Sequence, residues 1–123
     1  MKRTIVVFCT CLFLVFLSSC SKTASFDGSR TGNASQLIME YSVFNTSHSQ
    51  ILELNENDMI DVKIVNEAGE LSIKLQKEGS EKPIYDEDQV LTSEFQIAIE
   101  ESGKYLLKVE GKHTKGSLSF VKK

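Results

Sequence analysis

Apolar and polar residues alternate with a period of two through most of the chain after Gln36. Ile60, Val62 and Ile64, for example, alternate with polar residues. Similar runs lie at residues 71–75, 95–99, 105–109 and 118–120. Successive side chains of an extended strand point to opposite faces, whereas an amphipathic helix repeats its apolar residues at intervals of three and four. The alternation therefore predicts strands that are buried on one face, and it predicts no helix in this part of the chain.

Clusters of turn-forming residues separate the apolar runs. They lie at residues 55–58, 67–69, 77–80, 101–103 and 111–114. We expect eight strands, at residues 37–45, 49–54, 59–66, 70–76, 83–86, 93–100, 103–110 and 115–121. Connections this short favour antiparallel neighbours, because parallel neighbours need a longer crossover. Such spacing is typical of an all-β sandwich or barrel, and one sheet alone would leave its apolar face bare, so we predict an antiparallel two-sheet β-sandwich for residues 36–123.

The first residues of the chain form a different kind of segment. Lys2 and Arg3 precede an apolar run of 14 residues, from Thr4 to Leu17. A helix that spans a bilayer needs about 20 residues, so the run is short for that role. A basic start, a short apolar run and small residues after it are typical of a secretory signal peptide. An uncleaved membrane anchor and a buried core helix are the alternatives.

The apolar run ends in Leu17, Ser18, Ser19 and Cys20. These four residues resemble the lipobox of bacterial lipoproteins, in which an aliphatic residue and two small residues precede a cysteine. The resemblance implies that residues 1–19 are a cleaved lipoprotein signal peptide and that Cys20 becomes the lipidated first residue. It places the protein at the cell membrane, lipid-anchored on the extracytoplasmic face. All three cysteines lie at or before position 20, so the mature chain has no disulfide framework.

Residues 20–35 are predicted to be the lipidated cysteine and a flexible tether. They are rich in Ser, Gly, Thr, Asn and Ala, and Phe26 is their only large apolar residue. A segment of this composition buries too little apolar surface to order itself. A flexible chain of that length has an end-to-end distance of roughly 20 Å. The alternative is an ordered first strand around Phe26.

The charge of the chain argues against nucleic-acid binding. The formal net charge is −3, from 14 basic and 17 acidic residues. Without Lys2 and Arg3 the remainder has 12 basic and 17 acidic residues, a net charge of −5. Such a charge favours solubility and weakens attraction to nucleic acid and to anionic lipid. We therefore expect no nucleic-acid partner.

Several motifs between Leu52 and Phe120 form a folding signature. They include the run from Gly69 to Leu75 and the run from Gly103 to Val109, which is followed by Gly111 and Gly116. This layout resembles small lipoproteins of Gram-positive type with a jelly-roll-like sandwich of unknown function. It is also similar to the β-sandwich modules at the C-terminus of secreted bacterial peptidases and to the Golgi-dynamics (GOLD) sandwich. The resemblance implies a jelly-roll-like fold and transfers no catalytic residue.

No stretch of the sequence carries a recognisable catalytic motif, and no cofactor is expected. Asp86 and Asp88 are weak candidates for a calcium site, because carboxylates supply the oxygen ligands that this ion takes. They lack the regular ligand spacing of an EF-hand loop, so a solvated loop is favoured and no metal site is predicted. His48 and His113 lie in polar, turn-like surroundings and are interpreted as surface loop histidines.

These observations favour a non-enzymatic role. We expect a lipid-anchored binding or accessory module of the cell envelope, held to the membrane by the lipid on Cys20. Its ligand would be an envelope protein, a peptide or a polymer. The alternative is a bacteriocin or lantibiotic immunity lipoprotein, which sequesters a peptide at the membrane surface. The identity of the ligand does not follow from the residues.

Overall fold

The computed structural model describes residues 24–123, and all regular structure in that part of the chain is β-strand. The strands are β1 (Ser25–Asn33), β2 (Gln36–Asn45), β3 (Ser47–Leu54), β4 (Met59–Lys77), β5 (Tyr85–Glu87), β6 (Ser93–Ala98) and β7 (Gly103–Lys122). Every strand pair is antiparallel. The predicted all-β, antiparallel sandwich is therefore confirmed. Residues 24–123 contain no helix of the length and hydropathy that crossing a bilayer would require.

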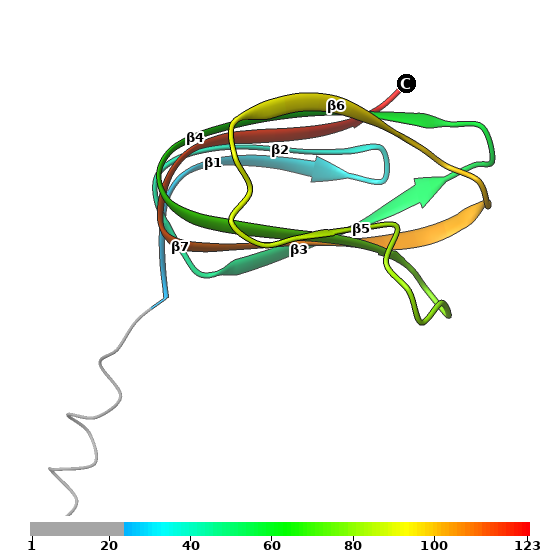
Figure 1. The fold of residues 1–123 in the computed structure, drawn as a ribbon, viewed down its shortest axis with the longest axis horizontal. Coiled ribbons are helices and arrows are strands. Elements are labelled where there is room, and N and C mark those ends of the chain that lie inside the picture. The colour runs from blue at the N-terminus through cyan, green and yellow to red at the C-terminus, as the bar shows by residue number, and fades with distance from the viewer. Residues whose placement is uncertain (1–23) are drawn as a thin grey trace, which may run out of the picture.

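The two layers of the sandwich belong to one folded sheet. β4 and β7 pair along most of their length, with Val62 opposite Phe120 in one layer and Ile73 opposite Val109 in the other. The layer containing Val62 is completed by β6, β2 and β1, and the layer containing Ile73 by β3 and β5. Figure 1 shows β4 and β7 curving from one layer into the other at one end of the molecule.

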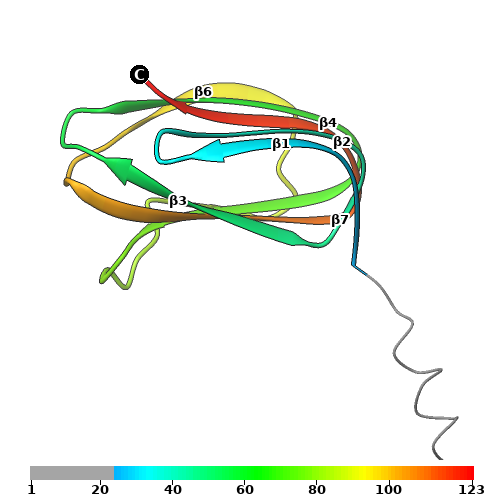
Figure 2. The same cartoon turned by 180° about the vertical axis from the view of Figure 1, so that it is seen from behind.

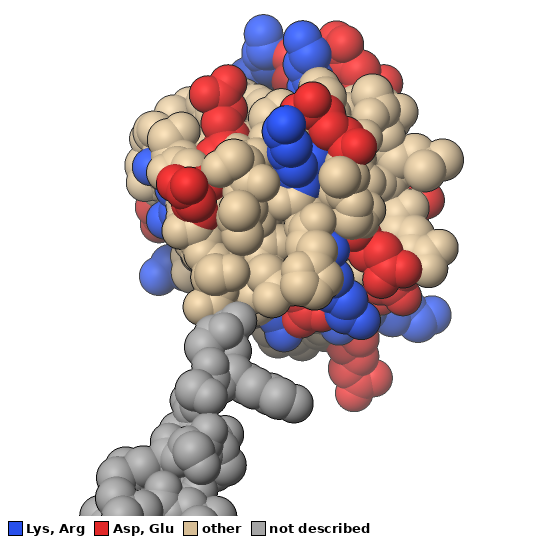
Figure 3. Space-filling model, turned by 90° about the vertical axis from the view of Figure 1, so that its left-hand side faces the viewer, with Lys and Arg blue, Asp and Glu red and all other residues tan. Residues whose placement is uncertain are grey.

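Irregular backbone at that end lets the long strands bend. The β4–β7 register shifts on both sides of Ala68, and Gly69 has a φ of 78°. Such bulges sharpen the local bend of a strand. The buried hydroxyl of Thr114 donates to the carbonyl oxygen of Glu70, 2.7 Å away, and so ties β7 to β4 at the bend. Acidic and basic side chains are interspersed over this end (Figure 3). Two pairs of predicted strands are thus joined, at 59–66 with 70–76 and at 103–110 with 115–121.

The predicted tether at residues 20–35 is wrong for most of its length. Residues Ser25–Asn33 form β1, which pairs with β2 along its whole length, from Ser25 opposite Asn45 to Asn33 opposite Gln36. Only Phe26 of this strand is partly buried. β1 is held by backbone pairing at a layer edge, which requires no apolar face. Cys20 and the lipobox residues Leu17, Ser18 and Ser19 lie outside the described residues.

β1 also closes one side of the sandwich against β3 (Figure 2). The guanidinium Nη2 of Arg30 donates to the carbonyl oxygen of Ser49 at 2.7 Å and to the Oε1 of Gln50 at 3.1 Å. The ring of Phe26 lies behind this contact, with its centroid 5.7 Å from Phe44. An edge strand with free backbone groups is prone to pair with another chain. Arg30 occupies an acceptor on the edge of β3 and so protects it.

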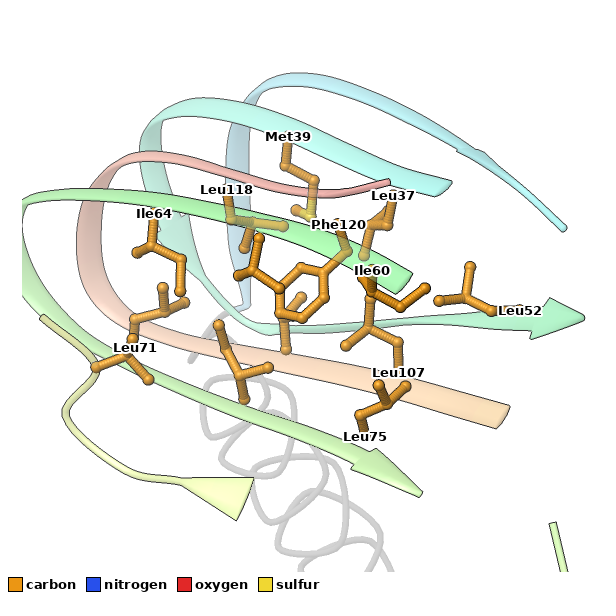
Figure 4. Packing of buried hydrophobic residues seen from close by; sticks show 14 of the residues in the cluster. Leu37, Met39, Leu52, Ile60, Ile64, Leu71, Leu75, Leu107, Leu118 and Phe120 are labelled. Atoms are coloured by element: carbon orange, nitrogen blue, oxygen red, sulfur yellow. The ribbon is translucent and has the colours of Figure 1, made fainter. Parts of the chain in front are cut away.

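The hydrophobic core fills the space between the layers (Figure 4). The inward-facing residues of β2, β4 and β7 contribute most of it. The aromatics expected in the core lie there: Tyr41, Phe44, Tyr105 and Phe120 are buried, and Phe95 packs against the cluster while partly exposed. Burying apolar surface contributes roughly 25 cal/mol per Å² and supplies most of the stability of such a domain.

Tyr41 gives the core an unusual polar atom. Its side chain is 4% exposed, and its hydroxyl has no hydrogen-bond partner among the described residues. A buried, unpaired hydroxyl costs about 1–3 kcal/mol. Burial also raises the pKa of Tyr41 to about 12. The phenol is therefore held neutral in the folded protein under conditions that would ionise it in the unfolded chain.

We expect Tyr41→Phe to leave the stability at pH 8 unchanged or to raise it by up to about 1 kcal/mol. Below pH 10 the phenol is neutral in both states, so no stability is lost there. As the pH rises from 10 to 12, only the unfolded chain releases its proton, which favours unfolding. At pH 11.5 the wild type should have lost about 2 kcal/mol more than the variant. Urea unfolding of both proteins at the two pH values measures this difference, and equal losses would contradict it.

Candidate functional site

The side of the sandwich opposite β1 and β3 is formed by β5 and β6. Each of these strands pairs with β4 only, so each lies at the edge of its layer. Figure 1 faces this side, with β6 above β5. The rings of Tyr85 and Phe95 bridge the two layers, with centroids 5.3 Å apart and an interplanar angle of 34°. This contact closes part of the open side and leaves a hollow beside it.

The hollow has a volume of about 340 Å³. It is lined by Ile84, Ile97, Ala98, Glu100, Glu101 and Tyr105, and we call it the β5–β6 groove. Ile84 is 44% exposed and Ile97 is partly buried against the core. The groove therefore combines apolar surface that water can reach with two carboxylates.

The polar groups of the groove differ in their partners. The hydroxyl of Tyr105 donates to the carbonyl oxygen of Glu101 at 2.6 Å, and the Nζ of Lys77 lies 3.6 Å from the Oε2 of Glu101. No lysine or arginine within residues 24–123 forms an ion pair with Glu100. Glu100 is thus the carboxylate of the groove that remains available to an incoming cation.

The two tyrosines beside the groove are held in their neutral form. Burial raises the pKa of Tyr105, and the nearby charge of Glu101 adds to that effect. Burial also raises the pKa of Tyr85, whose hydroxyl donates to the Oε2 of Glu87 at 2.8 Å. A phenol that stays protonated can donate a hydrogen bond but cannot act as a general base at neutral pH.

The loop that crosses from β5 to β6 is anchored on both sides of an exposed leucine. Val90 is buried, and its N–H donates to the carbonyl oxygen of Leu71 at 2.8 Å. The hydroxyl oxygen of Thr92 accepts from the N–H of Asn66 at 2.9 Å. Leu91, between these anchors, is 76% exposed. The open side thus presents a second apolar side chain in a defined position.

Charge is unevenly distributed along the folded chain. Residues 81–101, which form the open side, contain seven acidic residues and one basic residue, a net charge of −6. Residues 102–123 contain six lysines and one glutamate, a net charge of +5. Because β7 lies at the centre of both layers, the lysines are distributed over the rest of the molecule. The open side is therefore built from a strongly acidic segment of the chain.

The weak calcium candidates, Asp86 and Asp88, lie together at one hollow of the surface. The two aspartates line this hollow of about 180 Å³ together with Glu110 and with Lys74 and Lys108. No group of three histidine, cysteine, aspartate or glutamate side chains that could hold a metal ion occurs within residues 24–123. Calcium takes six to eight oxygen ligands, and two lysines at the same hollow oppose its charge.

The two histidines lie apart, and one was placed incorrectly from the sequence. His48 belongs to β3 and is partly buried, with its ring centroid 4.8 Å from that of Phe26. Burial and the charge of Arg30 lower its pKa, so it is a neutral packing residue at physiological pH. His113 is exposed at the bend of β7 with a φ of 50°. Neither histidine contributes to the β5–β6 groove.

The sequence did not reveal the β5–β6 groove. Its residues come from three separate segments, before β5, in and after β6, and near the start of β7. The charge balance of residues 81–101 was a usable signal, since no stretch of that length elsewhere in the chain is as acidic. Ile84 was a second signal, because an apolar residue in a predicted strand of four residues can face outwards as easily as inwards.

Comparisons with known proteins identify no family for this chain. No protein-family model matches it, and no curated protein matches its sequence. Among solved structures, the Aeromonas hydrophila periplasmic inhibitor of g-type lysozyme, PliG, is 17% identical, with 84% of this chain and 90% of that chain covered and a TM-score of 0.49.

Two further structures are similar at a lower level. The pre-peptidase C-terminal domain of a Bacillus anthracis collagenase is 13% identical, with 81% of this chain and 89% of that chain covered and a TM-score of 0.46. A xylan-binding module from Roseburia intestinalis is 13% identical, with 83% of this chain and 89% of that chain covered and a TM-score of 0.42. Because all three TM-scores are below 0.5, nothing about the ligand of this chain follows from these similarities.

Proposed function

We propose that this protein is a lipoprotein whose β-sandwich is a non-catalytic binding module at the extracytoplasmic face of the cell membrane. The observation that carries the binding role is the β5–β6 groove, where water-accessible isoleucines lie beside a carboxylate that has no ion-pair partner in the described chain. Well-packed domains usually bury such apolar surface, and a concave apolar surface with a few polar groups is the usual form of a binding site.

The anchor is proposed to be a lipid on Cys20. A basic start, a short apolar run and the four residues Leu17 to Cys20 support this assignment. Each buried CH₂ group of an acyl chain contributes about 0.8 kcal/mol to membrane binding, so two or more chains give a stable anchor. The membrane would then be reached through the lipid, while the folded domain remains free to bind an envelope protein, peptide or polymer.

Replacing Cys20 by serine should abolish lipidation. The serine cannot form the thioether to a diacylglyceryl group, so we expect loss of the acyl mass. Mass spectrometry of the N-terminal peptide measures this loss. Cys9→Ser is the matched control, since that cysteine would leave with the signal peptide. An unmodified wild-type chain in the cytosol would contradict the proposed anchor.

The binding role is tested by photo-crosslinking in living cells. A crosslinking amino acid at Ala98, which lines the groove, should give a reproducible adduct with an extracytoplasmic component. The same group at Thr31, an exposed position of β1 on the other side of the molecule, is the control. Adducts that are absent at Ala98, or equal at both positions, would contradict binding in the groove.

Bacteriocin or lantibiotic immunity is a narrower form of the same role. The acidic open side favours it, because residues 81–101 would attract a cationic peptide. A strain that lacks the gene should then become more sensitive to such a peptide, and an unchanged sensitivity over a panel of related peptides would count against immunity. The anchored binding module would remain the proposal in that case.

A further inference from the structure

We propose that the β5–β6 groove binds an extended peptide segment in which cationic and apolar side chains alternate. The inference rests on the proposed binding role and adds the chemical class of the ligand. It follows from three features of the open side: the apolar lining of the groove, the unpaired edge of β6 and the carboxylates beside both.

The apolar lining of the groove is the reason that every second side chain of the ligand is proposed to be apolar. Phe95 and Ile97 face the interior along β6, and Ile84, from the segment before β5, lines the groove together with Ile97. Their exposed surface lies in and beside the groove, where an apolar side chain of a ligand could cover it. Each CH₂ group that is buried in this way contributes about 0.8 kcal/mol.

The edge of β6 accounts for the extended conformation. Within the described chain β6 pairs with β4 alone, so its other edge carries free backbone N–H and C=O groups. An extended peptide can add to such an edge as a further strand. Its side chains then alternate between the two faces of the layer, as those of β6 do. One set would enter the groove over Ile97, and the other would lie on the outer face beside Glu94 and Gln96.

The negative charge of the open side is the reason that the other side chains of the ligand are proposed to be cationic. Glu94 lies on the outer face of β6, and the exposed Glu100, which has the same parity in the alternation, lies at the rim of the groove just beyond the strand end. Lys63 of β4 lies opposite Glu94 in the register, and Lys77 forms an ion pair with Glu101. These two lysines offset part of the negative charge. With these two lysines counted, the net charge of the open side falls from −6 to −4, which still repels an acidic peptide and attracts a basic one.

The size of the edge sets the length of the ligand. From Glu94 to Glu100 the chain advances six residues, or about 20 Å at 3.3 Å per residue. A heptapeptide in extended form covers the same distance. The probe is therefore a fluorescein-labelled heptapeptide in which lysine alternates with leucine, with a glutamate-for-lysine version as the opposite-charge control.

Fluorescence anisotropy with the full chain in detergent micelles tests the proposal. We expect saturable binding of the lysine peptide that weakens as salt is added, and none of the glutamate peptide. The double variant Glu94→Gln/Glu100→Gln should weaken the binding by about tenfold, as two partly exposed ion pairs would. Glu40→Gln/Glu53→Gln, on exposed positions of β2 and β3, makes the same change in net charge and should leave the affinity unchanged.

The apolar contribution has its own matched pair of variants. Ile84→Ser removes an exposed apolar side chain from the groove and should lower the affinity for the lysine peptide at least fivefold. Ile51→Ser makes the same change at a 38% exposed position on β3 and should have no effect. Circular dichroism checks that every variant is folded.

The outcomes distinguish this inference from the proposed function. Equal weakening by both glutamate pairs, or no saturable binding to the folded wild type, overturns the peptide inference. If Cys20 is then found lipidated and Ala98 still gives its adduct, the binding module stands with a ligand of another class. Binding that responds only to the open-side variants supports the inference.

Discussion

Gly116→Ala should destabilise the domain by about 3–5 kcal/mol, the combined cost of backbone strain and overpacking at one position. Gly116 has a φ of 148°, which side-chain-bearing residues rarely adopt, and it is buried where β7 lies against β4. A Cβ atom at this position would overlap the carbonyl oxygen of Val65. The backbone atoms of β4 cannot move away without breaking the pairing that joins the layers.

Gly79→Ala is the matched control for that prediction. Gly79 also has a positive φ, of 82°, but no atom lies within 4 Å of the position its Cβ would take. The substitution therefore adds strain without a clash and should cost about 1 kcal/mol. Urea unfolding of both variants measures the two values. A Gly116→Ala protein as stable as Gly79→Ala would show that β4 and β7 do not depend on their close approach at the bend.

Phe120→Ala should destabilise the domain by a similar amount, about 3–5 kcal/mol. Phe120 is 0% exposed and lies between Leu37 of β2 and Val62 of β4 in the sheet register. Its removal leaves a cavity at the centre of the core that the pleated layers cannot close. A loss of this size is a large part of the roughly 5–15 kcal/mol that holds a domain folded.

Leu106→Ala provides the comparison for Phe120→Ala. Leu106 lies on the same strand but is 40% exposed on the outer face. Its truncation should cost less than about 1 kcal/mol, because little buried surface is lost and no cavity forms. Thermal unfolding should separate the variants, with a fall in Tm for Phe120→Ala that is several times that for Leu106→Ala. Equal falls would mean that the two positions are equally buried in solution.

The period-two pattern was sufficient to predict strands that have one buried face. The predicted ranges at 37–45, 49–54 and 93–100 correspond closely to β2, β3 and β6. The pattern could not show that β4 and β7 continue through the bend. Turn-forming residues interrupt the alternation there, but bulges and the positive φ of Gly69 keep the two strands paired across it. Continuity depends on pairing between segments that are distant in sequence.

β1 and the β5–β6 groove were missed for a related reason. β1 is exposed on both faces except at Phe26, so its sequence lacks the alternation that identifies the other strands. Its order comes from the backbone of β2 and from the contact of Arg30 with β3. The groove depends on which side chains the folded sheet brings together, and local patterns contain no information on that.

The ordered β1 would set how far the domain can move from the proposed lipid on Cys20. Only residues 21–24 separate that position from Ser25. The five steps from Cys20 to Ser25 reach about 17 Å in fully extended form, which is less than a flexible tether of the predicted length would allow. A domain held so closely would bind its ligands in the water layer next to the headgroups. Its ligand would therefore have to approach the bilayer in order to be bound.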